Sequence, residues 1–173
     1  MDTLYLIHGE EKKLVKDAQD EILKKILDDD AGNNVSWYNM QNNTLDEIIA
    51  DACMMSLFGD KKVIVCKECV FLSSLTQTED EKKLSDDFVK YLDNPSENTV
   101  IILTLTENKL DERKKIVKEI KKRAKIISCQ KLSGNDLFNC AKEFLNEQGY
   151  KYEQKALRLL VDRIENNLEL LHR

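Results

Sequence analysis

Residues 99–105 read Thr-Val-Ile-Ile-Leu-Thr-Leu, and no other stretch of the 173-residue chain indicates its secondary structure as clearly. The run is rich in β-branched residues, which favour strands. Residues 100–103 are all apolar, although successive residues of a strand point to opposite faces of the sheet. A strand that is apolar on both faces is typical of a parallel sheet covered by helices on either side. Residues 99–105 therefore predict a layered α/β domain.

Strand-like and helix-like patterns alternate on both sides of this run. Short apolar stretches typical of buried strands occur at 4–7, 35–38, 62–66 and 126–127. Apolar residues at helical spacing predict helices at 10–27, 44–52, 83–92 and 112–124. Residues 73–82 are polar and predict a loop. We therefore expect residues 1–130 to form a three-layer α/β domain with a mostly parallel five-stranded sheet.

The pattern becomes purely helical after residue 130. Helical spacing at 133–148, 153–164 and 168–173 predicts a small three-helix domain over residues 131–173. The last apolar stripe begins at Leu168 and stops after six residues, at the end of the chain. We therefore expect this second domain to be truncated at its C-terminus.

The composition excludes several classes of protein. Hydrophobic residues make up 42% of the chain and charged residues 34%, which allows a real core beneath a well-solvated surface. The net charge of −5 argues against a dedicated nucleic-acid-binding domain. No apolar stretch approaches the ~18 residues of a membrane span, and the N-terminus has no signal pattern. We expect a cytoplasmic protein with no membrane partner and with reduced cysteines.

The turn after the first predicted strand lacks the residues of a phosphate-binding loop. A P-loop reads GxxxxGK[ST], whereas residues 9–16 read GEEKKLVK and keep only the first glycine. The strand at 62–66 ends at Cys66-Lys67, so no Asp-Glu pair follows it to hold magnesium. We therefore expect no nucleotide hydrolysis, no catalytic residues, and no cofactor or metal.

A lone Cys-x-x-Cys, formed by Cys66 and Cys69, leaves an alternative open. A structural zinc site needs two more ligands, and Cys129, Cys140 and the two histidines form no second pair at close spacing. A thioredoxin-like redox pair is the other functional interpretation, and buried thiols are the plain one.

The most apolar run of the chain, CMMSLF at 53–58, stops at the turn signal Gly59-Asp60. Such a run after an amphipathic helix either packs into the core or is exposed for a partner. Leu-Phe anchors dominate small interfaces, and methionine suits an adaptable contact surface. The residues alone leave both interpretations open.

Four blocks in order along the chain resemble those of a known family: YLIHGEE at 5–11, SLFGDKKVIV at 56–65, KLDERKKIVK at 109–118, and a Gly-Tyr followed by ALRLLV within 149–161. Together they resemble the delta subunit of the bacterial DNA polymerase III clamp loader. The resemblance implies a RecA/AAA+-like domain at 1–130 and a lid-like helical domain at 131–173. Because family members are about twice this length, it also implies that a third, collar domain is missing.

The resemblance implies a function without catalysis by this subunit. A delta subunit binds the sliding clamp (the beta subunit) and opens its ring for loading onto primed DNA during replication, while other loader subunits hydrolyse ATP. The implied partners are the clamp, the ATPase and delta-prime subunits, and, indirectly, primed DNA. The alternatives are a nucleotide-dependent AAA+ or other P-loop enzyme with a degenerate site, and a zinc or redox protein.

The resemblance also implies the clamp-binding residues, which follow the family pattern Gln-x-x-Ser-Leu-Phe. Ser56, Leu57 and Phe58 match it, Met54 and Met55 occupy its middle positions, and Cys53 stands in place of the glutamine. We expect residues 54–58 to bind the clamp, with weaker polar anchoring than a glutamine would provide.

Basic residues gather between positions 109 and 125. They are either the solvated face of an amphipathic helix or a surface near DNA in the loader. The candidates for the second role are Arg113, Lys114, Lys118 and Lys122.

Overall fold

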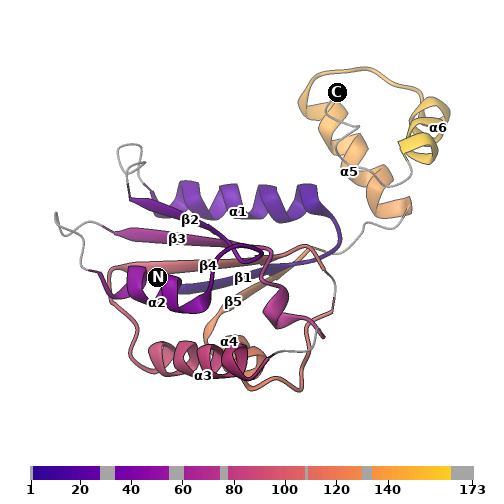
Figure 1. The fold of residues 1–173 in the computed structure, drawn as a ribbon. Helices are drawn as coiled ribbons and strands as arrows, with labels where there is room; N and C mark the ends of the chain where they lie inside the picture. The colour runs from indigo at the N-terminus through magenta and orange to yellow at the C-terminus, as the bar shows by residue number, and fades with distance from the viewer. Residues whose placement is uncertain are drawn as a thin grey trace. The chain divides into compact units, whose positions relative to one another are not determined.

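A computed structural model describes residues 2–27, 34–54, 61–74, 78–107, 109–129 and 134–164 of the chain. The chain divides into two compact units, Met1–Cys129 and Gln130–Arg173. The first unit contains a sheet with helices on both faces, and the second is helical in its described part (Figure 1).

The sheet of the first unit has five strands in the order β2-β3-β4-β1-β5, and every pairing is parallel. The predicted α/β fold with a five-stranded parallel sheet is therefore confirmed. The strands are β1 (Leu4–His8), β2 (Val35–Asn39), β3 (Lys62–Lys67), β4 (Thr99–Leu105) and β5 (Lys125–Ser128).

Strand β4 lies in the middle of the sheet, and all seven of its residues are buried. Its alternate side chains enter two separate hydrophobic clusters, with Ile101 and Leu103 on one face and Val100 and Ile102 on the other. Full burial of one such aliphatic side chain contributes about 1.5–3 kcal/mol, so a strand buried on both faces requires helices on both faces.

Helix α1 covers one face of the sheet, and α2, α3 and α4 cover the other (Figure 1). On α1 the buried positions Val15, Ile22 and Ile26 form one stripe at helical spacing. The helices of the first unit are α1 (Lys12–Ile26), α2 (Leu45–Cys53), α3 (Glu79–Asp93) and α4 (Lys115–Arg123), with a 3₁₀ turn, η1 (Val70–Leu72), after β3.

Helix α3 begins earlier than its apolar pattern indicates. The prediction of a loop over 73–82 is wrong from residue 79 onward. Thr78 and Glu81 form a capping box, in which Glu81 accepts a hydrogen bond from the Thr78 N–H at 2.7 Å and Thr78 Oγ1 accepts one from the Glu81 N–H at 3.3 Å. The first turn of α3 consists of exposed acidic residues, which suit the positive end of the helix dipole but carry no apolar periodicity.

The second unit contains α5 (Gly134–Glu147) and α6 (Gln154–Ile164). Ala141 of α5 and Leu157 and Val161 of α6 are buried. Gly149 has a φ of 74°, the left-handed conformation that ends many helices. The predicted start at Ser133 and the predicted third helix at 168–173 lie outside the described residues.

Within the described part of the chain, no helix is both long and apolar enough to cross a membrane.

Candidate functional site

Because all strands of the sheet are parallel, the first unit has two edges that carry different kinds of connection. At the edge where strands end, each strand leads into a helix, and this is where nucleotides bind in open α/β sheets. At the edge where strands begin, helices lead back into strands. We call the first the carboxyl edge and the second the amino edge. The apolar run at 53–58 lies between the end of α2 and the start of β3, and so it belongs to the amino edge.

The connection between β1 and α1 at the carboxyl edge is only three residues long, Gly9–Glu11. The backbone of Cys129 closes it from the side: a Cβ on Gly9, whose φ is +155°, would lie 1.7 Å from the Cys129 carbonyl oxygen. The Cys129 N–H donates to the carbonyl of His8 at 2.7 Å. A phosphate loop needs several residues whose N–H groups surround the phosphate, and this short, covered turn offers no such cradle.

The two cysteines of the Cys-x-x-Cys are buried at the carboxyl end of β3, Cys66 within the strand and Cys69 just after it. The Cys69 thiol donates to the carbonyl of Cys66 at 3.3 Å, and burial raises the pKa of both thiols. A thiol of this kind is a poor nucleophile because the thiolate is the reactive form. Among the described residues, no group of three or more His, Cys, Asp or Glu side chains comes together to hold a metal ion. The geometry therefore favours packing as the role of this pair.

Helix α2 ends at Cys53, and the residue that follows it, Met54, is 66% exposed. Cys53 is exposed as well and carries a free thiol. The other predicted clamp-binding residues, Met55, Ser56, Leu57 and Phe58, lie outside the described residues. The structure therefore places the beginning of the predicted clamp-binding segment on the surface.

The last turn of α2 is held by side chains from two other segments. The carbonyl of Asp51 accepts a hydrogen bond from Lys62 Nζ at 2.6 Å, and the carbonyl of Ala52 accepts one from Ser96 Oγ at 2.7 Å. Carbonyls in the last turn of a helix have few partners within the helix, and these bonds add to the one that the Asp51 carbonyl accepts from the Met54 N–H at 3.1 Å. Lys62 is the first residue of β3, and one side chain thus joins both ends of the segment at 54–61.

An ion pair between Lys62 and the Asp51 carboxylate also holds the last turn of α2 to the start of β3. Both side chains are largely buried, with 15% exposure for Lys62 and 16% for Asp51. Burial by itself raises the pKa of Asp51, but hydrogen bonds from Lys62 and Ser36 together with the positive charge of Lys62 outweigh it, so the pKa is lowered. Burial, followed by the charge of the Asp51 carboxylate, raises the pKa of Tyr38 to about 12.

The sequence did not predict these contacts of Lys62 and Ser96 with the last turn of α2, which we call the anchor. Asp51 is a single acidic residue in the last turn of a helix, and Lys62 begins a strand, so neither has a local pattern that predicts the pairing. Only a register in which the end of α2 meets the start of β3 brings them together.

Three of the four basic residues predicted to lie near DNA are engaged with protein groups. Arg113 forms a bidentate pair with Asp111, in which both bonds are 2.9 Å long. Lys114 Nζ donates to the carbonyl of Phe71 at 3.0 Å, and burial lowers its pKa. Lys122 pairs with Glu119 at 2.7 Å. Lys118 is exposed on α4 and forms no ion pair with any residue that the structure describes.

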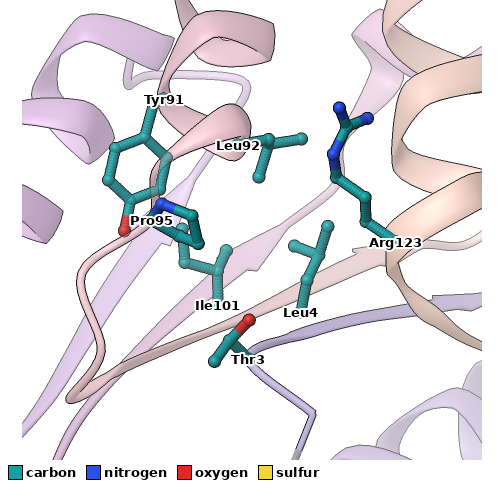
Figure 2. A pocket seen from close by; sticks show the side chains of 7 residues that line it. All are labelled: Thr3, Leu4, Tyr91, Leu92, Pro95, Ile101 and Arg123. Carbon is teal, nitrogen blue, oxygen red and sulfur yellow. The ribbon is translucent and has the colours of Figure 1, made fainter.

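A pocket of about 300 Å³ also opens at the amino edge, and no local sequence pattern indicates it. Figure 2 shows Tyr91 and Pro95 on one side and Arg123 on the other, with apolar side chains between them. The lining comes from the starts of β1 and β4, the ends of α3 and α4, and the loop before β4: Thr3, Leu4, Tyr91, Leu92, Pro95, Ile101 and Arg123. Residues this far apart in the sequence form a pocket only through the tertiary fold.

We predict that Asp51→Asn lowers the free energy of unfolding at pH 7 by about 2–3 kcal/mol, because it leaves Lys62 with an unpaired, largely buried charge. The folded-state pKa of Asp51 is lowered, so its contribution is complete above the unfolded-state pKa of about 3.9 and is lost as pH falls through the folded-state value. Urea titrations at several pH values test this.

The matched control is Asp17→Asn, which breaks an exposed pair with Lys13 and should cost less than about 0.5 kcal/mol. Equal losses in the free energy of unfolding for the two substitutions at pH 7 would contradict the predicted role of the ion pair between Asp51 and Lys62. So would a difference in stability between Asp51→Asn and the wild type that persists unchanged below pH 3.

Comparison with known proteins agrees with the fold. A family profile described as DNA polymerase III, delta subunit, matches residues 5–130. The DNA polymerase III subunit delta of Bacillus subtilis is 27% identical over 134 residues, which cover 77% of this chain and 39% of that protein.

Two solved structures share the fold at low sequence identity. A Bacillus subtilis DNA clamp loader delta protein superposes with a TM-score of 0.75 at 21% identity, covering 99% of this chain and 52% of that one. Domain III of the replication initiation protein DnaA of Thermotoga maritima superposes with a TM-score of 0.52 at 10% identity, covering 98% of this chain and 72% of that one.

The chain thus spans 39% of its curated relative and about half of the solved delta protein. The family profile spans almost the entire first unit, from Tyr5 in β1 to Gln130, and includes both the covered turn at Gly9 and the segment at 54–61. The chain belongs to the DNA polymerase III delta subunit family.

Proposed function

We propose that this chain is the clamp-binding part of a clamp-loader delta subunit. Residues 54–58 bind the sliding clamp and help to open its ring for loading onto primed DNA. The remaining partners are the ATPase and delta-prime subunits of the loader, and the work takes place in the cytoplasm, where a bacterial chromosome is copied. The observation that carries the proposal is the match of the delta family over residues 5–130, which contain the segment at 54–58.

The anchor at the last turn of α2, which leads into the segment at 54–58, supports this proposal. A peptide that projects from a protein binds more tightly when its ends are already held, because less conformational entropy is lost on binding. Here Lys62 and Ser96 hold the last turn of α2, and Met54 leaves that turn exposed to solvent. Cys53 and Met54, the first two residues of the apolar run, are both exposed, in line with a run that begins at the surface.

The double variant Leu57→Ala, Phe58→Ala should bind the cognate sliding clamp at least about tenfold more weakly than the wild type, since it removes two apolar anchors of the proposed contact. Surface plasmon resonance with immobilised clamp measures the affinities. Circular dichroism should show an unchanged fold, because in this proposal Leu57 and Phe58 contact the clamp and not the core.

Leu159→Ala is the matched control, since Leu159 is 65% exposed on α6 of the second unit and should not affect binding. Unfolding of the double variant would mean that residues 57 and 58 are core residues, and the proposed clamp contact would then be wrong. Equal clamp binding by the wild type and the double variant would have the same meaning.

We propose further that the chain leaves ATP hydrolysis to other subunits. The covered three-residue turn at Gly9 supports this, as do the carboxylates of Glu10 and Glu11, which have the same charge sign as a phosphate. Isothermal titration of the protein with Mg-ATP should give no binding heat up to millimolar nucleotide. A micromolar dissociation constant would instead favour a nucleotide-dependent AAA+ protein.

Direct contact with DNA by α4 and the two residues before it is at most supplementary in this proposal, because Arg113, Lys114 and Lys122 already have protein partners. Lys118 is the residue that we assign to a phosphate contact. In the assembled loader with clamp, Lys118→Ala should reduce the slope of log affinity for primed DNA against log salt by about 0.9, the value for one lost phosphate contact.

Lys16→Ala is the control for this measurement, since Lys16 is exposed on α1, across the sheet from α4. An unchanged slope for Lys118→Ala would remove α4 from the DNA path. A reduction of the same size for both variants would mark a general charge effect.

A further inference from the structure

We propose that the outer edge of β2 is an interaction surface for a second copy of this chain. In this contact the β2 strands of two copies pair antiparallel across a two-fold axis, and the two sheets join into one. The inference is independent of the proposed function, because it uses none of residues 54–58.

Strand β2 lies at one side of the sheet and pairs with β3 alone. The carbonyl of Asn34 accepts a hydrogen bond from the Val63 N–H at 2.9 Å. At the other end of the strand, the Met40 N–H donates to the Lys67 carbonyl at 2.8 Å. Residues that bond to a given neighbour alternate along a strand, so the even-numbered residues of β2 bond to β3. The odd-numbered residues direct their backbone groups to the outer edge.

Two residues of this outer edge are open. At a third odd-numbered position, Asn39, the N–H donates to Asn43 Oδ1 at 3.1 Å, and the carbonyl accepts from the N–H groups of Asn42 and Asn43 at 2.9 Å. The outward backbone groups of Val35 and Trp37 bond to no residue that the structure describes. These two residues therefore offer their N–H and C=O groups to another strand.

The side chain of Trp37 adds an apolar contact to the open edge. Its ring is 51% exposed, although Lys67 Nζ lies 4.5 Å from the ring centroid. Alternate residues of a strand share a face, so Trp37 lies on the same face as Val35, which packs against the cluster beneath α1. Tryptophan is enriched where proteins bury surface against one another. The open edge thus carries an aromatic side chain beside a β-branched one.

No charged residue on β2 protects this edge. Residues 31–45 form the longest stretch of the chain without Asp, Glu, Lys or Arg, in a sequence that is 34% charged. Natural sheets usually protect their edges with charged residues or with very short strands. Strand β5, at the opposite side of the sheet, has four residues and begins with Lys125. The comparison identifies β2 as the side that is suited to pairing.

The edge fits a second copy because it is complementary to itself. A two-fold axis at Ser36 places Val35 opposite Trp37 of the second copy, and Trp37 opposite Val35 of that copy. In an antiparallel ladder, each such pair exchanges both of its N–H···O=C bonds. Each pair also brings an aromatic ring beside a β-branched side chain, a favourable cross-strand combination. A charge on β2 would meet a charge of its own sign near such an axis, and β2 has none.

The size of the contact sets its strength. A strand of five residues is about 17 Å long, and the surface along it is smaller than the ~800 Å² that each partner buries in a stable complex. We therefore expect a weak dimer with a dissociation constant of about 0.1 mM.

The first test follows the wild-type chain at increasing concentration. Between about 10 μM and about 1 mM, amide hydrogen exchange of Val35 and Trp37, measured by NMR, should slow about fourfold, since pairing protects their N–H groups. Trp37 is the only tryptophan of the chain, so the fluorescence emission should shift to shorter wavelength over the same range.

The second test places a charge on the edge. Trp37→Lys should raise the dissociation constant of the dimer, measured by sedimentation equilibrium, at least about tenfold. Ile126→Lys is the matched control, because it puts the same charge at a 37% exposed apolar position of β5. It should leave the dissociation constant within about twofold of the wild type. The exchange measurement uses the wild type and does not depend on whether Trp37→Lys folds.

A wild-type chain that stays monomeric up to about 1 mM overturns the proposal. So does a dimer in which the amides of Val35 and Trp37 exchange as fast as in the monomer, and so do equal effects of Trp37→Lys and Ile126→Lys. None of these results changes the conclusion on residues 54–58, whose clamp contact the double variant tests separately.

Discussion

The burial of β4 on both faces is the constraint on which the rest of the first unit depends. All seven residues of this strand are buried, and its neighbours β3 and β1 run parallel to it. Parallel neighbours require crossover connections, and here those connections are the helices that cover the two faces. The same topology sends every helix-to-strand connection to the amino edge, including the segment at 54–61 and the loop around Pro95.

The two edges of the sheet differ in what they leave accessible. At the carboxyl edge, where many α/β proteins bind nucleotides, the backbone of Cys129 covers Gly9 and the turn into α1 is three residues long. At the amino edge, an exposed Met54 follows a helix end that is held by Lys62 and Ser96. This contrast agrees with the proposed function, in which the amino edge, and not the carboxyl edge, carries the contact with a partner.

Sequence reasoning succeeded where a signal was local and failed where it was not. The strand at 99–105 was predicted with the bounds that the structure has, because β-branched residues and burial act on each position separately. The start of α3 was missed, since its first turn is stabilised by the capping box of Thr78 and Glu81 and not by apolar spacing. The sequence showed the basic residues in and before α4. It did not show that most of the cations predicted to lie near DNA have carboxylate or carbonyl partners, as Arg113 has with Asp111.

By itself, the sequence determined the alternation of strands and helices, the parallel sheet, and the lack of a P-loop at Gly9, because each of these follows from the identity and spacing of neighbouring residues. It also contained the Ser-Leu-Phe at 56–58 that points to the delta family. The tertiary structure alone decided the order of the strands, the pairing of Asp51 with Lys62, and the pocket beside Pro95. The physical reason is that these features join segments distant in the chain, which meet only when the sheet buries β4 from both sides.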